Sequence, residues 1–240
     1  MSRPKLLDLF SGAGGAAVGY HRAGFEVYGV DLNPMLNYPF PFWQADALGV
    51  LATLNAGGHV SFIGPGLRMI ERLCLADFDA VHASPPCQAS TTLTKGTNAG
   101  REYPQLIPAT RAALLATGLP TVMENVQGSD LRRDLTLCGE MFGLDVIRHR
   151  YFEVNFPVAQ PGHVAHRGRV AGMRHGEWFT GPYFAVYGDG GGKGTVAQWQ
   201  TAMGINWTNV RKEIAEAIPP AYSRYIGAQL LAHIEAERAA

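Results

Sequence analysis

The first 30 residues hold a strand, a glycine-rich turn, a helix and a second strand, and this unit restricts the possible folds most. Lys5–Leu9 is a short, mostly apolar run, and the loop Ser11-Gly12-Ala13-Gly14-Gly15 follows it directly. Ala16–Ala23 has a helical pattern that Gly24 ends, and Glu26–Val30 has the pattern of a second strand. This order is the opening of a parallel α/β sheet.

The rest of the chain continues this alternation, with two exceptions. The other predicted elements are strands at Asp79–Ala83 and Pro120–Glu124, a strand pair or bent strand at Val146–Val154, and helices at Ala109–Ala116, Glu213–Ala217 and Ala221–Glu235. Gly49–Ala76 fits poorly and is predicted to be a helix plus an inserted loop. Ala159–Gly194 is rich in glycine, histidine, arginine and aromatic residues, which indicates a small lobe.

Composition excludes several classes of protein. The 240 residues are 47% hydrophobic and 17% charged, which is a globular balance and not that of a disordered chain. The three cysteines include no C-x-x-C pair, so we expect neither a metal site nor a disulfide scaffold. Lysine plus arginine equals aspartate plus glutamate at 20 each, which argues against a broad basic coat but allows a local basic groove.

The N-terminal sequence gives an expectation about location. It begins MSRPKLLDLF, without the apolar core or cleavage site of a signal peptide, and no stretch of 18 apolar residues follows anywhere. We therefore expect a cytoplasmic protein without a membrane span.

The glycine loop matches a nucleotide-binding pattern. Gly12-x-Gly14-x-x-Ala17 fits the dinucleotide fingerprint, and Asp31 lies about 20 residues beyond this glycine motif. The helix N-terminus offers free N–H groups to an anion, and a carboxylate can accept hydrogen bonds from ribose hydroxyls. This chemistry suits NAD and S-adenosylmethionine equally, and a glycine turn without a ligand is the third interpretation.

A second pattern places a cysteine after two prolines. Ser84-Pro85-Pro86-Cys87-Gln88 follows a predicted strand, and the prolines make the turn stiff. Cys87 is therefore a candidate nucleophile, since a thiolate attacks electron-poor carbon well. The alternative is a buried structural cysteine, which is the interpretation we give to Cys74 and Cys138.

Glu124 also ends a predicted strand, where it is either an acid/base group or an exposed loop residue. The glycine loop, Asp31, Cys87 and Glu124 all lie where predicted strands end. In open α/β sheets these ends share one edge, and ligands bind there.

Taken in order, these motifs resemble those of cytosine-C5 DNA methyltransferases. The matching segments are Asp8–Gly15, Pro85-Pro86-Cys87-Gln88, Glu124-Asn125-Val126, Arg148-His149-Arg150 and the C-terminal run from Ile218-Pro219-Pro220 to Ile226-Gly227. The resemblance implies a Rossmann-like, S-adenosylmethionine-dependent methyltransferase fold of the α/β class with a small recognition lobe. It implies three regions: a catalytic and cofactor-binding core at 1–156, a reduced recognition lobe at 157–205 and a returning helical segment at 206–240.

The resemblance also implies a mechanism on duplex DNA. The target cytosine rotates out of the duplex, and Cys87 adds to C6 so that C5 can accept a methyl group. Glu124 would contact the N3 and amine edge of the base, and Arg148 and Arg150 would lie near the base and its phosphates. Pro86 and Asn125 complete the implied catalytic set.

Cofactor residues follow from the same resemblance. Those implied to line the S-adenosylmethionine site are Phe10, Ser11, Gly12, Gly14 and Gly15. Asp31 would hold the ribose and Leu32 would pack against adenine. Asp46 would meet the adenine amine, with a solvated loop acid as the alternative.

DNA contacts are implied for two further segments. Ser90–Gly100 resembles the family's loop that closes over DNA, which gives Gln88, Ser90 and Lys95 as candidates. In the lobe, Arg167, Arg169 and Arg174 are candidate phosphate contacts, unless the segment is a solvated loop. We expect a monomer that binds duplex DNA.

The sequence departs from the family in three places. Ala215-Glu216 stands where the family has Gly-Asn, only about 60 residues are available for the recognition region, and Leu48–Phe78 is longer than a connection needs. Three alternatives stay open: an RNA cytosine-C5 methyltransferase, a nicotinamide-dependent oxidoreductase and a catalytically idle DNA-binding protein. The target sequence and the biological role in a bacterial or virus-infected cell are also open, and protection in a restriction–modification system, gene regulation and a viral origin all fit.

Overall fold

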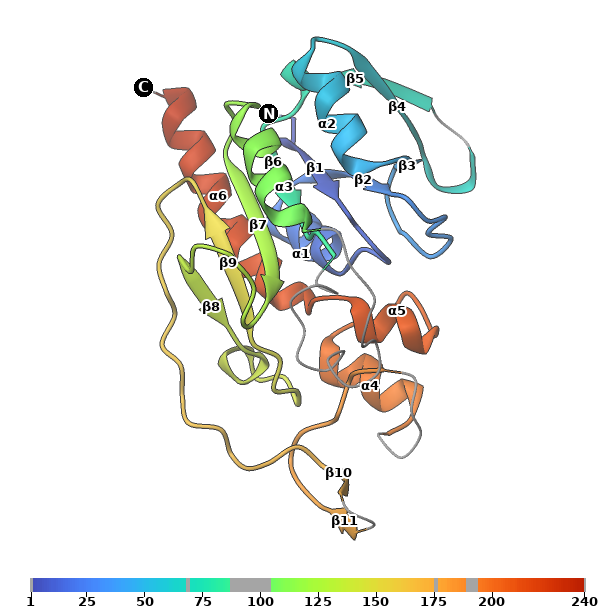
Figure 1. Cartoon of the computed structure of the whole chain (residues 1–240), viewed down its shortest axis with the longest axis vertical. Coiled ribbons are helices and arrows are strands. Elements are labelled where there is room, and N and C mark those ends of the chain that lie inside the picture. Colours follow the sequence, from blue (N-terminus) through green and yellow to red (C-terminus); the bar gives the residue numbers. More distant parts are fainter. Residues whose placement is uncertain (1, 68–69, 87–104, 175–176, 189–193, 240) are drawn as a thin grey trace.

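A mixed sheet forms the centre of the molecule in a computed structural model that describes residues 2–67, 70–86, 105–174, 177–188 and 194–239 (Figure 1). Its nine strands, in spatial order, are β5 (Ile70–Cys74), β4 (His59–Ile63), β3 (Phe42–Gln44), β2 (Glu26–Asp31), β1 (Lys5–Leu9), β6 (Ala80–Ala83), β7 (Thr121–Val126), β9 (Arg150–Val154) and β8 (Leu135–Leu137). In the middle of the sheet, the neighbours β3, β2, β1, β6 and β7 pair in parallel. At each edge the two outer strands, β4 and β5 on one side and β9 and β8 on the other, pair antiparallel with their neighbours.

The strand order reverses at β1, and in open α/β sheets ligands bind at such a reversal. β1 pairs with β2 on one side and with β6 on the other, so the chain leaves the sheet in opposite directions after these strands. In an open α/β sheet this reversal opens a crevice at the carboxyl ends of the two strands. The glycine loop follows β1 and Ser84 follows β6, so two of the predicted motifs meet at this point.

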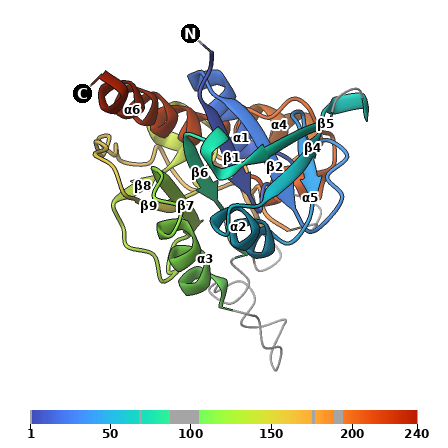
Figure 2. The same ribbon diagram turned by 90° about the horizontal axis from the view of Figure 1, so that it is seen from above.

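Helices cover both faces of the sheet (Figure 2). α1 (Gly15–Ala23) and α6 (Pro220–Ala239) lie on one face, and α2 (Ala47–Asn55) and α3 (Leu106–Leu115) lie on the other. The helix predicted from the four-residue spacing of apolar side chains is confirmed in α6.

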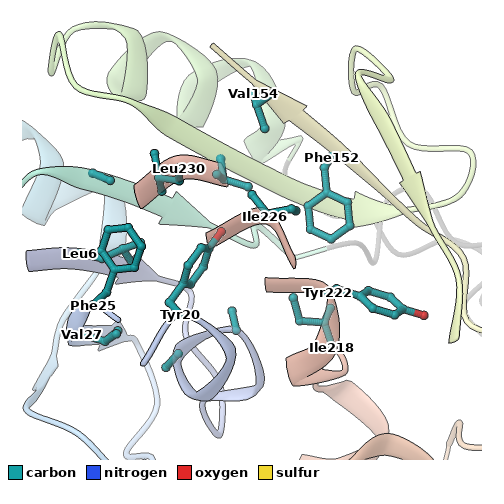
Figure 3. Close-up of a cluster of buried hydrophobic side chains, with 14 of the residues drawn as sticks. Leu6, Tyr20, Phe25, Val27, Phe152, Val154, Ile218, Tyr222, Ile226 and Leu230 are labelled. Atoms are coloured by element: carbon teal, nitrogen blue, oxygen red, sulfur yellow. The ribbon is translucent and has the colours of Figure 1, made fainter. Parts of the chain in front are cut away.

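The α1–α6 face carries a core of large side chains (Figure 3). Tyr20, Tyr222, Ile226 and Leu230 are fully buried there, and each such apolar side chain contributes on the order of 2 kcal/mol. The helices approach closely at Gly19, where an added Cβ would lie 1.9 Å from Ser223 Oγ. Only glycine fits at this contact, which fixes α6 across α1 and beneath the glycine loop.

The C-terminal half adds smaller elements. α4 (Val196–Met203) and α5 (Arg211–Glu216) pack over a small core that includes Trp199 and Ile214. Short 3-10 turns are η1 (Pro65–Leu67), η2 (Leu75–Asp77) and η4 (Gly139–Phe142). A two-stranded hairpin of β10 (Gly172–Arg174) and β11 (Glu177–Phe179) lies at the end of the molecule opposite both termini (Figure 1). Within the described residues, no helix has the length and apolar character needed to cross a membrane.

The structure corrects the prediction for Gly49–Ala76. The helix is present as α2, but the predicted inserted loop is wrong, because β4 and β5 form an antiparallel hairpin that extends the sheet. Val60 and Phe62 alternate into the core along β4. The hairpin is tied to β2 by the Tyr28 hydroxyl, which donates to Glu71 at 2.7 Å.

A second correction concerns Val146–Val154. Only Arg150–Val154 forms a strand, and its partner β8 comes from upstream and was not predicted. β8 has three residues, which is too short for an alternating pattern to stand out. The helix α4 was also missed, since it lies directly after the glycine run of the predicted lobe.

Candidate active site at the carboxyl edge of the sheet

The glycine loop has the geometry of a ligand cradle. Phe10 has a φ of 55° and Gly12 a φ of 50°, so the chain turns through left-handed backbone immediately after β1. A Cβ built on Gly12 meets no atom within 4 Å, which leaves open space above this residue. The Ser11 hydroxyl is buried without a hydrogen-bond partner among the described residues. A buried hydroxyl normally has a partner, so Ser11 is available to a bound molecule.

Asp31 lies beside this loop at the end of β2. One carboxylate oxygen accepts from the backbone N–H of Gly12 at 3.0 Å, and the other accepts from that of Asn33 at 2.9 Å. A carboxylate offers about four lone-pair positions, so capacity remains for ribose hydroxyls. The adjacent Leu32 is 68% exposed, which leaves its side chain free to cover a flat ring.

Three other predicted cofactor residues have local structural roles. Gly14 caps α1 in a left-handed conformation with a φ of 90°. An added Cβ on Gly15 would lie 2.4 Å from the Ile218 carbonyl, so Gly15 lets the C-terminal motif approach α1. Asp46 is the N-cap of α2 and accepts from the Gly49 N–H at 2.8 Å. Its contact with an adenine amine stays a prediction.

The loop has a further anchor that sequence reasoning missed. The indole N–H of Trp207 donates to the carbonyl of Ala13 at 2.7 Å, across 194 positions of sequence. The segment between α4 and α5 therefore supports the glycine loop from the C-terminal side. A lone tryptophan in sequence carries no signal for such a contact.

Glu124 and Arg150 meet at the end of β7. Arg150 Nε lies 3.0 Å from Glu124 Oε1, and the two side chains are 15% and 7% exposed. Burial raises the pKa of the Glu124 carboxyl above its usual value, and the nearby Arg150 and Ser84 offset only part of that effect. The carboxyl group is thus positioned by a fixed cation and holds a proton more readily than a solvated glutamate does.

Asn125 links this strand end to the proline turn. Its amide Nδ2 donates to the carbonyl of Pro85 at 2.9 Å, and its own Oδ1 accepts from the N–H of Val126 at 2.9 Å. Pro85 is buried and Pro86 is exposed. The predicted residues Cys87, Gln88, Ser90 and Lys95 lie outside the described residues.

Arg148 has a different environment from Arg150. Its guanidinium donates to the carbonyls of Val186 at 2.9 Å and Ala215 at 2.6 Å, and the residue is 8% exposed. It therefore joins the residues just before β9 to the segment around Val186 and to α5. Ala215-Glu216, which stands where the resembling family has Gly-Asn, lies at this contact. Arg148 binds the backbone carbonyl of Ala215, so the contact does not depend on which side chain is present.

Two of the three arginines predicted to contact phosphate, Arg167 and Arg169, make contacts within the protein. Arg167 forms ion pairs with Glu140 at 2.8 Å and Asp145 at 3.0 Å. Arg169 is exposed and lies over the ring of Phe179, 5.6 Å from its centroid. Arg174 belongs to β10, where only its backbone is described. Phosphate contacts from these residues stay predictions, and Arg167 would have to exchange two carboxylate partners to make one.

A buried polar network under the site was not predicted. His82 in β6 contacts the Tyr20 hydroxyl through Nδ1 at 3.0 Å and the Ser84 hydroxyl through Nε2 at 2.9 Å. Burial lowers the pKa of His82 to about 3 and raises that of Asp8 to about 8. The one sequence signal for buried polar groups here is Asp8, an acid between apolar residues of a predicted buried strand.

A separate cavity of about 460 Å³ opens beside α6. Its lining includes Phe142, Leu144, Met203 and Tyr225, and none of the predicted site residues. It therefore does not belong to the carboxyl-edge site.

Known proteins resemble this chain in part of its sequence and in its fold. No protein-family model matches the sequence. Over 96 residues, 40% of the chain, the sequence is 33% identical to the type II methyltransferase M.XorII of Xanthomonas oryzae pv. oryzae, and it spans 22% of that protein's length.

Two solved structures resemble the whole chain. One is a presumed DNA modification methyltransferase encoded within an E. coli prophage, with a TM-score of 0.60 and 13% identity over 97% of this chain and 99% of that one. The other is the Dnmt2 methyltransferase of S. pombe, with a TM-score of 0.50 and 14% identity over 96% and 99%. The chain thus has the Rossmann-like α/β fold of S-adenosylmethionine-dependent methyltransferases, which confirms the predicted fold class.

Proposed function

We propose that the protein transfers a methyl group from S-adenosylmethionine to C5 of cytosine in duplex DNA. The observation that carries this proposal is the buried Glu124–Arg150 pair, because it lies next to the Asn125–Pro85 contact at the sheet edge that holds the open glycine loop. The similarity to M.XorII, which is named a type II methyltransferase, supports the reaction class.

The glycine loop and Asp31 fit S-adenosylmethionine. The unpartnered Ser11 hydroxyl and the open space over Gly12 suit the polar amino-acid end of the cofactor, and the free acceptor capacity of Asp31 suits its ribose. When bound, the cofactor supplies an electrophilic methyl group on a sulfonium. Phe10 and Leu32 would flank it as the apolar walls.

Cys87 is proposed as the nucleophile, from its place in sequence one residue after Pro86. Its thiolate would form a bond to C6 while the C5–C6 π electrons move to C5. C5 would then bond to the methyl carbon as the bond between that carbon and the sulfonium sulfur breaks, with S-adenosylhomocysteine as the leaving group. A base removes the C5 proton, the C5–C6 double bond forms again, and the thiolate leaves.

Glu124 is proposed to hold a proton at the N3 edge of the base. Its raised pKa favours the protonated carboxyl, which can donate a hydrogen bond to N3 and draw electron density from C6. Arg150 would orient the carboxyl through the 3.0 Å contact. Such a base must leave the duplex stack to reach a buried carboxyl.

Product analysis tests the proposal. The purified protein is incubated with cofactor carrying an isotopically labelled methyl group and with duplex DNA or transfer RNA, and the nucleosides are then separated by mass. We expect label in 5-methyldeoxycytidine from duplex DNA and none in a Cys87→Ala reaction. Label in N6-methyladenine or N4-methylcytosine would overturn the C5 assignment, and label only in transfer RNA would overturn the DNA assignment.

A further inference from the structure

Four side chains with metal-binding atoms converge away from the carboxyl-edge site. Cys138, His149, His163 and His166 each present one ligand atom, and all four atoms lie within 4.8 Å of one another. Cys138 Sγ is 3.5 Å from His166 Nε2, and His149 Nε2 is 3.2 Å from His163 Nε2. Within the described residues, this is the one group of histidine, cysteine and acidic side chains with metal-site spacing.

The fold brings these residues together in two pairs. Leu137 of β8 is paired with Arg150 of β9, so Cys138 and His149 come next, opposite each other at the end of the antiparallel pair. His163 and His166 are separated by two residues in the irregular segment that follows β9. One pair therefore comes from a rigid strand end and the other from a chain segment that folds back over it.

The spacing agrees with a tetrahedral zinc site. With Zn–S at about 2.3 Å and Zn–N at about 2.05 Å, tetrahedral ligands lie about 3.6 Å apart for sulfur and nitrogen and about 3.3 Å apart for two nitrogens. The observed 3.5 Å and 3.2 Å distances match these two edges. The two edges also share no atom, so between them they include all four ligands.

Ordinary hydrogen bonds do not account for the whole group. The rings of His149 and His163 are stacked at 10° with centroids 5.3 Å apart, and His166 lies 5.3 Å and 5.0 Å from them. Hydrogen bonding would explain either close pair by itself. It gives no reason for three imidazoles and a thiol to direct one atom each at a common centre, whereas a cation at that centre does.

We propose that Cys138, His149, His163 and His166 bind a zinc ion. Thiolate and imidazole donors in a tetrahedral set are those that zinc prefers. Four protein ligands leave no open position for water or substrate, so the ion has a structural role. The site revises the expectation, drawn from the absence of a C-x-x-C pair, that the protein holds no metal.

The ion would attach the lobe to the catalytic sheet. His166 packs against the ring of Tyr183, whose hydroxyl donates to Glu140 in η4 and accepts from the backbone N–H of Arg167 at 2.8 Å. His149 lies between Arg148 and Arg150 in sequence, so the same ion would restrain the start of β9. This role is independent of the proposed methyl transfer and would hold for any activity of the site.

Metal analysis of protein produced without a polyhistidine tag tests the site. We expect about one zinc per chain in the wild type by mass spectrometry of the metal content, and at least a ten-fold lower content in Cys138→Ser and His163→Ala. His163 is exposed, so His163→Ala keeps the test valid if Cys138→Ser does not fold. The matched controls Cys74→Ser and His59→Ala should retain about one zinc.

Cobalt substitution identifies the ligands. After removal of zinc with a chelator, addition of Co²⁺ should produce the visible bands of a tetrahedral centre and a thiolate-to-cobalt charge-transfer band, and Cys138→Ser should lose the latter. A wild-type protein with less than about a tenth of a zinc per chain and no cobalt spectrum would overturn the proposal. So would zinc content unchanged in His163→Ala, or stoichiometric copper in place of zinc.

Discussion

Arg150 Nε lies 3.0 Å from Glu124 Oε1, and this contact joins two antiparallel neighbours in the sheet. Glu124 pairs with Phe152 in the register of β7 and β9, so Arg150 lies two residues further along and reaches back toward the carboxyl group. Both side chains are largely buried, which prevents solvent from screening their interaction. The strand pairing thereby fixes a proton-holding acid next to the proline turn.

Glu124→Gln tests the role of that acid. We expect kcat for methyl transfer to fall about 10²- to 10⁴-fold, because an amide can donate a hydrogen bond to N3 but cannot transfer a proton to it as C6 is attacked. Cofactor affinity should stay unchanged. Glu153→Gln is the matched control, since Glu153 is a buried acid on β9 that pairs with Arg111 at 2.7 Å. It should lower stability and leave kcat within about three-fold. Equal losses in the two variants would assign Glu124 a structural role only.

Asn125→Ala tests whether the proline turn is held from β7. Loss of the 2.9 Å bond to the Pro85 carbonyl should misplace the turn and lower kcat by about 10²-fold, with the cofactor Kd unchanged. Asn155→Ala is the control, since Asn155 bonds main-chain groups of Leu119 and Thr121 at the opposite end of the same strand. Single-turnover methyl transfer measures both. A larger effect of Asn155→Ala would contradict the assignment.

Gly12→Ala tests the cofactor cradle. Gly12 has a φ of 50° and Gly57, in the turn after α2, a φ of 79°, and an added Cβ meets no atom within 4 Å at either position. The two alanine variants therefore carry a similar backbone cost of about 1 kcal/mol. Only Gly12→Ala should weaken S-adenosylmethionine binding, by about ten-fold or more in calorimetric titration, because its methyl group occupies the proposed ligand space. Equal affinities would place the cofactor elsewhere.

Asp8 makes stability depend on pH. Burial raises its pKa from 3.8 to about 8 in the folded protein. The folded state therefore binds one proton more at Asp8 than the unfolded chain does between these values. The contribution of Asp8 to stability is fully present below pH 3.8 and is lost as pH rises through about 8. Between these two pKa values, the contribution of Asp8 to the free energy of unfolding falls by about 1.4 kcal/mol per pH unit.

Asp8→Asn should remove this dependence. Between about pH 6 and pH 9, the free energy of unfolding measured in urea should fall by roughly 3 kcal/mol more for the wild type than for the variant. Asp46→Asn is the control, because Asn caps a helix as well as Asp does and position 46 is exposed. Its pH dependence should parallel that of the wild type. A parallel profile for Asp8→Asn would show that Asp8 is ionised in the folded protein.

Local patterns predicted part of the fold and of the site. β1, α1 and β2 follow from contiguous apolar runs and glycines. Glu124 lies near the carboxyl end of β7, but the strand continues two residues beyond the predicted end, to Val126. The different environments of Arg148 and Arg150 could not be predicted, because the carbonyls that bind Arg148 belong to residues 38 and 67 positions away. The β4–β5 hairpin was hidden for a related reason, since its stability comes from pairing and from the Tyr28–Glu71 contact.

The histidine cluster illustrates the same limit. His163 and His166 lie close together in sequence, but Cys138 and His149, the other two proposed ligands, are brought together only by the register of β8 and β9. A lone cysteine between strands is most often structural. Cys138 becomes a candidate ligand only because the antiparallel pairing of β8 and β9 brings it next to His149.

Duplex DNA with 5-fluorocytosine at the target position tests the central claim most directly. Fluorine cannot leave C5 as a proton does, so a covalent route stops with Cys87 bonded to C6. With S-adenosylmethionine present, we predict a protein–DNA adduct that survives denaturing electrophoresis, carries one methyl group and is absent in Cys87→Ala. If the wild-type protein methylates ordinary duplex DNA but forms no such adduct, the covalent cysteine mechanism is wrong.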